Sequence, residues 1–324
     1  MQATELIKKS NAYASLRRDL DGGRLAHAYM IVSEDTKSTD TLCDLFLARY
    51  IYGSDDDTTL ERVRSVDKAD IQRFPKGDGG KVLVSDVEEI IDTVYFTPVE
   101  LEKKFYIIDN FETANSASQN KLLKVLEEPP KSVVFLLKCS KKEAVLSTVL
   151  SRVRQVEITP VPDEQITQYL ISCYGESPKV YVASAMSGGF AYKAEELMTD
   201  KKEIDMFTSA LETLKGMKTS KQLLTYSARL IAYKDKLSRL IQTFELILCD
   251  CMRASSGVRA ELRFKGNVRE ITELSREYTA EVVLKLRSSL VRAQQRLELN
   301  GNAQSVLDEF LFSLLEVKAK CRKS

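Results

Sequence analysis

The stretch AHAYMIVSEDTKSTDTL (26–42) joins an apolar segment to a helix-like one, which is where many nucleotide-binding proteins hold phosphate. A working phosphate loop reads G-x-x-x-x-G-K-[ST]. Its glycines let backbone N–H groups wrap the phosphates, its lysine reaches the β- and γ-phosphates, and its hydroxyl holds Mg²⁺. Counted from the strand without gaps, the four defining positions contain neither glycine nor lysine and hold Ser33, Ser38, Thr39 and Asp40.

Acidic residues occupy this loop where glycine and lysine are expected. Glu34, Asp35 and Asp40 each add repulsion toward a polyphosphate, on the order of 1 kcal/mol near a solvated surface. Lys37 is close by but out of register with the lysine of the motif. We therefore predict a vestigial phosphate loop that does not bind ATP tightly, and no nucleotide cofactor is expected.

A second candidate segment, KFYIIDNFETA (104–114), is an apolar strand that ends in Asp109. In nucleotide hydrolases such an aspartate positions Mg²⁺, and in those of the AAA+ class a glutamate that orients the attacking water usually follows it. Here Asn110 follows, and its neutral amide is a poor base. Asp109 and Asn110 therefore indicate a vestigial metal-positioning strand. Two separate losses at one site predict a chain that does not hydrolyse ATP.

Alternating strand-like and helix-like segments must position these residues within 1–161. The strand-like runs are short and continuously apolar, which is typical of a parallel sheet covered on both faces. They lie at 27–32, 81–84, 104–109, 132–138 and 153–158. The helix-like segments lie at 36–52, 85–95, 113–128 and 140–150. This alternation predicts an α/β domain with an open, mainly parallel sheet.

The pattern changes after ITPVP (158–162), and no convincing strand follows. Residues 162–202 are interpreted as a small domain of short helices interrupted by glycine and proline. Residues 203–324 repeat apolar positions such as Leu223 and Leu230 at three- and four-residue spacing, which predicts longer amphipathic helices. The expected fold class is therefore an α/β domain followed by two all-α domains.

Composition and charge exclude several classes of protein. The 324 residues include 48 Lys and Arg against 47 Asp and Glu, so no global positive charge attracts nucleic acid or anionic lipid. The N-terminal residues lack the apolar core of a signal peptide, and no apolar run approaches the length of a membrane span. We therefore expect a cytoplasmic protein without a membrane partner.

The cysteines and the histidine form no metal-ligand pattern. The six cysteines are scattered, and the close pair Cys249 and Cys251 lies on a helix-like run where residues two apart point to different sides. They are interpreted as reduced thiols that pack as small apolar groups. His27 has no Cys or His neighbour and is interpreted as packing at a strand edge. No metal cofactor is expected.

A resemblance to a known family enters with the segment FYIIDNFETANSASQNKLLKVLEEPPKSVVFLL (105–137). It resembles the central signature of bacterial clamp-loader subunits of the AAA+ class, in which a strand-end aspartate leads into an N-x-L-L-K-x-L-E-E-P-P helix. The match is carried by Asn120, Leu122, Leu123, Lys124, Leu126, Glu127, Glu128, Pro129 and Pro130. Residues 23–31 resemble the family's entry into its first strand, 187–197 its lid motif and 292–315 the end of its collar. The resemblance implies a lid domain at 162–202 and an oligomerising collar at 203–324.

The segment STVLSRVRQVEITP (147–160) resembles the family's S-R-C region. Ser151 and Arg152 are kept, and Val153 replaces the cysteine. In the family this arginine is an arginine finger, so the resemblance implies that Arg152, supported by Ser151, stabilises phosphate charge in the ATP site of a neighbouring subunit. Together with the altered phosphate loop, it implies a non-hydrolysing subunit of the DNA polymerase III clamp loader, within the polymerase holoenzyme.

The resemblance also implies partners. They are the motor subunits gamma and tau, the delta subunit, the sliding clamp and primer–template DNA, assembled in a hetero-pentamer. Lys121 and Lys124 lie three apart on the helix that faces DNA in the family, so they are candidate phosphate contacts, with a solvated helix face as the alternative. Many relatives carry a four-cysteine zinc module, but residues 48–80 contain no cysteine, and no zinc is expected.

Two alternative functions remain open. An active motor subunit would bind nucleotide despite the altered residues 33–40, and binding of a fluorescent ATP analogue by the isolated chain tests it. A pure assembly scaffold would depend on the helices of 203–324 and not on Arg152, which would then be an ordinary surface arginine. Normal turnover by a complex with Arg152 replaced would favour the scaffold.

Overall fold

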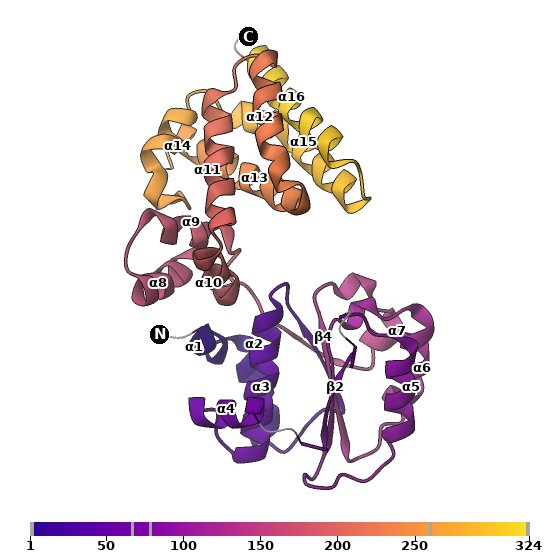
Figure 1. The fold of residues 1–324 in the computed structure, drawn as a ribbon. Coiled ribbons are helices and arrows are strands. Elements are labelled where there is room, and N and C mark those ends of the chain that lie inside the picture. Colours follow the sequence, from indigo (N-terminus) through magenta and orange to yellow (C-terminus); the bar gives the residue numbers. More distant parts are fainter. Residues whose placement is uncertain (1–2, 66–67, 78–79, 259–260, 322–324) are drawn as a thin grey trace. The chain divides into compact units, whose positions relative to one another are not determined.

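The computed structural model describes residues 3–65, 68–77, 80–258 and 261–321. The chain forms two compact units, Met1–Pro160 and Val161–Ser324. The first contains a sheet flanked by helices and the second is helical (Figure 1). The predicted fold class, an α/β region with a parallel sheet followed by an all-α region, is confirmed. The predicted separation of lid and collar between residues 202 and 203 stays a prediction.

A five-stranded parallel sheet forms the centre of the first unit, with the strand order β2-β3-β4-β1-β5. Its strands are β1 (Ala28–Val32), β2 (Ile71–Phe74), β3 (Lys104–Ile108), β4 (Val133–Cys139) and β5 (Arg154–Glu157). In register, Ala28 lies opposite Phe135, and Lys104 lies opposite Val133. Every residue of the three central strands is buried, as their continuous apolar sequences predict.

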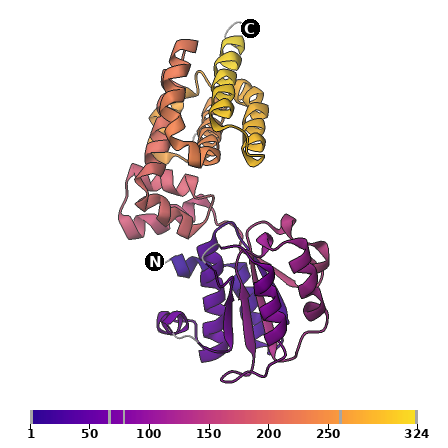
Figure 2. The ribbon, with the colours of Figure 1, turned by 45° about the vertical axis from the view of Figure 1, so that its right-hand side comes forward.

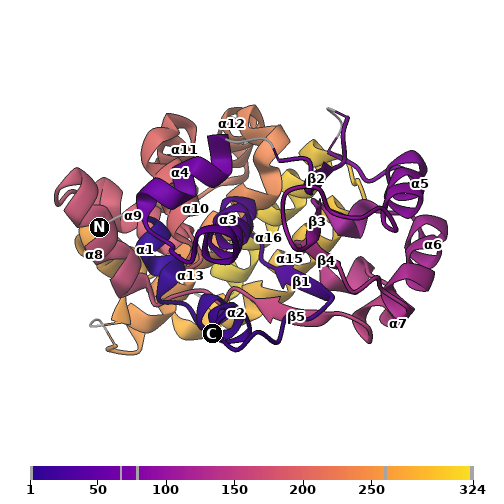
Figure 3. The ribbon, with the colours of Figure 1, turned by 90° about the horizontal axis from the view of Figure 1, so that it is seen from below.

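Helices cover both faces of this sheet, and Figure 3 shows α3 on one side with α5 and α6 on the other. The helices of this unit are α1 (Ala3–Lys8), α2 (Asn11–Asp21), α3 (Thr36–Tyr52), α4 (Asp57–Ser65), α5 (Val84–Thr93), α6 (Ser116–Glu127) and α7 (Ser147–Leu150). Two 3₁₀ turns, η1 (Phe111–Thr113) and η2 (Lys142–Ala144), complete it. The helix expected at 140–150 is therefore wrong over most of its length, since only η2 and the short α7 form there.

Four of the five predicted strands are confirmed to within one residue at each end, but the strand predicted at 81–84 is wrong. Val84 is instead the first residue of α5, and the N–H of Leu83 donates to Asp86 Oδ2 at 2.8 Å. A third-position carboxylate that reaches back in this way is a typical helix-start interaction. The real strand, β2, was missed because it is an edge strand whose sequence, IQRF, is only partly apolar.

Helices alone make up the described part of the second unit, as predicted, and Figure 2 shows them from a second direction. They are α8 (Asp163–Tyr174), α9 (Pro178–Met186), α10 (Ala191–Thr199), α11 (Lys201–Gly216), α12 (Ser220–Leu230), α13 (Leu237–Ser255), α14 (Val268–Leu274), α15 (Ala280–Glu298) and α16 (Ala303–Cys321), with the 3₁₀ segments η3 (Ile231–Lys236) and η5 (Lys265–Asn267). The predicted apolar stripes are buried at Leu237, Phe244, Leu286 and Leu290. Within the described residues, no helix is both long and apolar enough to span a bilayer.

Candidate functional site

The turn after β1 becomes helical almost at once, because only residues 33–35 separate Val32 from the start of α3. The N–H groups of Ser38 and Thr39 both donate to the carbonyl oxygen of Asp35, at 3.1 and 3.2 Å. Residues 36–40 of the gapless phosphate-loop alignment therefore lie inside a helix. Backbone N–H groups committed to helical hydrogen bonds cannot wrap a polyphosphate as those of a phosphate loop do.

Hydrogen bonds within the chain stabilise this turn. The N–H of Ser33 donates to the carbonyl of Cys139 at 3.0 Å, and its Oγ accepts from the N–H of Asp35 at 3.1 Å. Ser38, which is buried, donates through Oγ to Asp35 Oδ2 at 2.7 Å. The hydroxyls that a phosphate loop would offer to a metal–nucleotide complex thus have partners within the chain.

A cavity of about 200 Å³ lies at the carboxyl ends of the central strands. It brings together five of the predicted residues, Ser33, Thr39, Asp40, Asp109 and Asn110, with Thr36, Lys138, Cys139 and Ser140. Ser38 does not line it. This edge of an open α/β sheet is where ligands commonly bind, but small-molecule pockets usually measure about 300–1,000 Å³. The cavity is small for a nucleoside triphosphate.

Lys138 holds the predicted acidic residues together. Its side chain rises from β4 and is only 7% exposed. Its Nζ lies 2.7 Å from Asp109 Oδ1 and forms a second ion pair with Asp40. A buried ammonium must be paired to offset its lost hydration, and these two carboxylates pair it. The acid after β1 therefore has a partner inside the chain.

The charge on Lys138 is maintained by its surroundings. Burial alone lowers the pKa of this ammonium, but the ion pairs with the carboxylates Asp109 and Asp40 outweigh burial and raise it. Burial also raises the pKa of the Cys43 thiol to about 12, so this thiol is neutral at pH 7. One ammonium against two carboxylates leaves the cavity with a net negative charge, which disfavours a polyphosphate.

Asp109 and Asn110 occupy the end of β3 as predicted, and neighbouring backbone fixes both. The N–H of Asp109 donates to the carbonyl of Phe74 at 2.8 Å. Asn110 adopts a left-handed conformation, with φ 49°, which Asn tolerates better than most residues. Its Nδ2 donates to the carbonyl of Gly80 at 3.0 Å, so this amide is held by the chain.

Arg152 and Ser151 lie apart from the cavity, in the turn between α7 and β5. The Arg152 side chain is 35% exposed, and its Nη2 lies 2.7 Å from Glu127 Oε1 at the end of α6. Its Nη1 donates to the carbonyl of Thr148 at 2.9 Å and to Ser151 Oγ at 3.1 Å. Sequence reasoning assigned support to Ser151, but it missed Glu127.

Arg154 differs from Arg152 although it lies only two residues further on. Its guanidinium forms an ion pair with Asp19 of α2 and donates to Ser15 Oγ at 2.8 Å. The contacts of Arg154 thus tie the edge strand β5 to α2, which is a structural role.

The two candidate DNA-contacting lysines have different surroundings. Lys121 Nζ lies 2.5 Å from Glu88 Oε1 on α5, so its charge is already paired. Lys124 is exposed one turn further along α6. The predicted core residues of this helix, Leu122 and Leu126, are buried, and Leu123 is partly buried against the same core. Contact with DNA stays a prediction.

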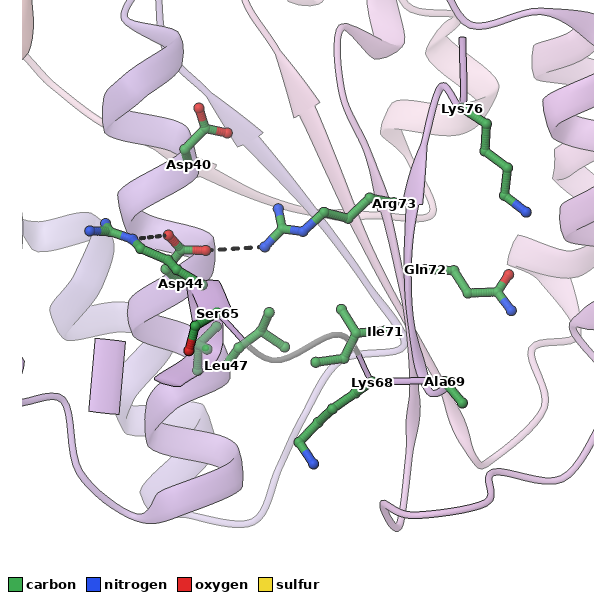
Figure 4. Close-up of a pocket in the computed structure, with 12 residues that line it drawn as sticks. Asp40, Asp44, Leu47, Ser65, Lys68, Ala69, Ile71, Gln72, Arg73 and Lys76 are labelled. Atoms are coloured by element: carbon green, nitrogen blue, oxygen red, sulfur yellow. Dashed lines mark hydrogen bonds and ion pairs between the residues drawn. The ribbon is translucent and has the colours of Figure 1, made fainter. Parts of the chain in front are cut away.

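A larger cavity, of about 880 Å³, lies between α3, α4 and β2. Figure 4 shows Arg73 of β2 reaching toward Asp44 of α3. Asp44 is 8% exposed and pairs with Arg73 at 3.1 Å and with Arg64 of α4 at 2.8 Å. Through these ion pairs, Arg64 and Arg73 of the cysteine-free region 48–80 connect α4 and β2 to Asp44 of α3, and little unpaired charge is left for a ligand.

Metal-ligand geometry was also predicted to be absent. Among the described residues, no group of three or more His, Cys, Asp or Glu side chains is arranged to hold a metal ion. Cys43, Cys139, Cys173, Cys249 and Cys251 are free thiols, and the side chain of Cys321 lies outside the described residues. The expectation of a chain without metal stays a prediction.

The sequence of β4 contains a feature from which the ion pairs of Lys138 could have been predicted. Lys138 is the only charged residue in the otherwise apolar strand VVFLLKC. A lysine in a central, buried strand needs a counter-charge; Asp109 follows the end of the neighbouring strand β3, and Asp40 lies near the start of α3, which follows the other neighbour, β1. Glu127 was marked only as part of the family signature, and nothing in its own sequence context indicates a contact with Arg152.

Comparison with protein families gives a match over the first unit. Residues 8–162 match the family described as "DNA polymerase III, delta subunit". The match covers nearly the whole α/β unit and just under half of the chain. Over nearly its whole length, the α/β unit is therefore similar to this family of DNA polymerase III subunits.

Curated relatives match over a similar region. The DNA polymerase III subunit gamma of Buchnera aphidicola subsp. Acyrthosiphon pisum is 26% identical over 172 residues, covering 51% of this chain and 47% of that protein. The subunit tau of Escherichia coli K12 is 27% identical over 184 residues, covering 51% of this chain and 27% of that protein. The alignments thus span less than half the length of either relative.

Solved structures that align with most of this chain include two bacterial proteins. A gamma subunit-related protein of Thermotoga maritima is 18% identical, with a TM-score of 0.43 and coverage of 97% of this chain and 98% of that one. The Bacillus subtilis clamp loader delta protein is 12% identical, with a TM-score of 0.37 and coverage of 94% and 99%. Such loose similarity supports no statement about individual residues.

Proposed function

We propose that this chain is the delta-prime subunit of a bacterial DNA polymerase III clamp loader, a subunit that hydrolyses no ATP itself and lends an arginine finger to a neighbouring motor subunit. The observation that carries the proposal is the buried ammonium of Lys138 between Asp40 and Asp109. It fills, with the chain's own charge, the place where a nucleotide hydrolase holds metal and triphosphate. The helical start at Thr36 supports the same conclusion.

The second part of the proposal concerns Arg152. A planar, permanently charged guanidinium stabilises the γ-phosphate as charge shifts to the leaving group. Arg152 is part-exposed at the end of a short helix, so a neighbouring subunit can reach it. Supplied from outside, such a group is worth about 10³- to 10⁵-fold in turnover. Ser151 supports it by accepting a hydrogen bond from Nη1.

The proposed setting is the cytoplasm, in a hetero-pentamer with the gamma/tau and delta subunits that loads the sliding clamp onto primer–template DNA. The match of the α/β unit to the family supports association with other DNA polymerase III subunits. Neither zinc nor tightly bound ATP is part of the proposal.

Replacement of Arg152 by alanine in the reconstituted clamp loader tests this function. ATP turnover is measured with primed DNA and clamp, and the turnover that the substitution removes is defined as the Arg152-dependent ATPase. We expect the complex to assemble normally and to lose the turnover of one adjoining site. Arg152→Lys should lose most of it as well, because an ammonium lacks the planar fork. Lys142→Ala, at an exposed position nearby, is the control. Undiminished turnover with Arg152→Ala would contradict the finger and favour a scaffold.

An active motor subunit is the second candidate, because the curated relatives described above are gamma and tau subunits. Equilibrium titration of the isolated chain with a fluorescent ATP analogue and Mg²⁺ separates the two. The delta-prime proposal expects no saturable binding in the micromolar range. Tight, magnesium-dependent binding would support the motor instead.

A further inference from the structure

The guanidinium of Arg152 is held by acceptors from two different helices. Its Nη1 donates to the Thr148 carbonyl and to Ser151 Oγ, and its Nη2 lies 2.7 Å from Glu127 Oε1. These contacts use only part of arginine's N–H donors, so others remain for phosphate oxygens. The side chain is thus restrained while part of its hydrogen-bonding capacity stays available.

The acceptors do not restrain the side chain in the same way. Thr148 and Ser151 belong to the short segment that carries Arg152 itself, which Val149 anchors in the core. Glu127 is the last residue of α6, a separate helix whose Leu122 and Leu126 are buried in the same core. Of these contacts, the one to Glu127 joins the guanidinium to a second element of the α/β unit.

Orientation matters because a finger acts across a subunit boundary. A long arginine side chain has several rotatable bonds, and its freedom must be lost before it can stabilise a transition state. A carboxylate that holds a functional group from behind lowers this cost, as such carboxylates do behind metal-binding histidines. We propose that Glu127 is a positioning residue for Arg152. This inference rests on the proposed function of Arg152.

The charge of Glu127 does not cancel that of Arg152. The Glu127 side chain is 47% exposed, so solvent weakens its attraction for the guanidinium. The contact can therefore orient the Arg152 side chain while the guanidinium keeps most of its electrostatic attraction for a phosphate bound by a neighbouring subunit.

The adjacent Glu128 is a matched control. It follows Glu127 at the end of α6, is exposed, and forms no ion pair within the part of the chain that the structure describes. Replacing Glu128 removes the same charge from the same helix end but leaves the contact with Arg152 in place. A general effect of acid at this surface would appear in both variants.

The experiment measures the Arg152-dependent ATPase of the reconstituted clamp loader with Glu127→Ala, Glu127→Gln and Glu128→Ala. We expect Glu127→Ala to lower its kcat about 10-fold with little change in the KM for ATP, because orientation acts on the transition state. Glu127→Gln, which keeps an acceptor oxygen at the same reach, should restore part of the loss. Glu128→Ala should match the wild type. In an Arg152→Ala background, Glu127→Ala should have no further effect.

Several results would overturn the inference. Turnover with Glu127→Ala equal to that with Glu128→Ala would remove the positioning role, and a rise would mean that Glu127 restrains the finger instead of aiding it. A further loss in the Arg152→Ala background would show that Glu127 acts by another route. If Arg152→Ala alone has no effect, the proposed function fails first, and this inference fails with it. Thermal unfolding of each isolated variant checks the fold. Because Glu127 is exposed, its replacement should leave the unfolding temperature nearly unchanged.

Discussion

Lys138 accounts for Asp40, the carboxylate near the start of α3. A lysine in a central strand needs negative partners, and Asp40 and Asp109 provide them at the carboxyl end of the sheet. The same ion pairs occupy the cavity where the sequence alone predicted a vestigial nucleotide site. The predicted absence of tight nucleotide binding and this internal ion pair therefore concern the same cavity.

Substitution of Lys138 by methionine tests this account. The change leaves Asp40 and Asp109 without their cation, and we expect a loss of about 1–3 kcal/mol of unfolding free energy, less than for fully buried carboxylates because both are part-exposed. Urea denaturation at pH 7 measures it. Lys142→Met, at an exposed lysine, should cost less than about 0.5 kcal/mol. Equal effects of the two substitutions would contradict the account.

Single residues were predictable where their type carries the chemistry. Asp109, Asn110 and Arg152 were identified from strand ends and motif residues, and the structure places Asp109 and Asn110 in one cavity with Asp40. The partners Lys138 and Glu127 were not identified. Their roles depend on which elements become neighbours in the fold, and the spacing of residues along one segment contains no such information.

At the scale of elements, Asp70 shows how a buried carboxylate fixes a loop. Asp70 precedes β2, is 1% exposed, and accepts hydrogen bonds from the N–H groups of Val99, Glu100 and Leu101. Burial by itself would raise the pKa of this carboxyl, but the three N–H donors outweigh burial, so its pKa lies below the ordinary value. The charged form of Asp70 thus stabilises the connection between α5 and β3.

This shift has a definite consequence for stability against pH. A carboxyl whose folded-state pKa is depressed stabilises the fold above its unfolded pKa, near 3.8, and this contribution is lost as the pH falls through the folded value. Asp70→Asn should therefore cost about 1–3 kcal/mol at pH 7, and its difference from the wild type should shrink below about pH 4. Urea denaturation at several pH values measures both. Asp92→Asn, at an exposed position on α5, is the control at pH 7. A pH-independent difference for Asp70→Asn would contradict this role of its charge.

Elements were predictable from sequence in proportion to their burial. The central strands β1, β3 and β4 are apolar except for Lys104 and Lys138, and their positions were found. The edge strand β2 was missed because one side of it has no neighbouring strand, so its sequence need not be apolar. For the segment KVLV the error was the reverse, because an apolar sequence was predicted as a strand where none forms. Val82 is buried, but Leu83 is 57% exposed and precedes a helix.

At the scale of the whole molecule, the helical unit presents apolar side chains that its own core does not cover. On α15, Leu284 is 61% exposed and Val291 44%, on the helix face opposite the buried Leu286 and Leu290. Leu284 and Val291 line a hollow of about 500 Å³ with Arg287, Ser288, Arg292 and Gln295. Because this unit is expected to pack against other subunits, these exposed residues are the ones to test.

Leu284→Asp and Val291→Asp should impair assembly with the motor and delta subunits while leaving the thermal unfolding of the isolated chain nearly unchanged. Buried charge at a subunit boundary is costly, whereas the same charge on a free surface is not. Size-exclusion chromatography of mixed subunits measures assembly. Leu299→Asp is the matched control, since Leu299 is 82% exposed beyond the end of α15 and outside the hollow. Normal assembly with both α15 variants would exclude this face as a boundary.

The three-residue link between β1 and α3 limits what substitutions alone could change in this turn. Glycine and lysine placed at positions 38 and 39 would still sit on a backbone that is helical from Thr36 onward. A longer connection would free more peptide groups, so building a phosphate-binding loop here would require an insertion as well as substitutions.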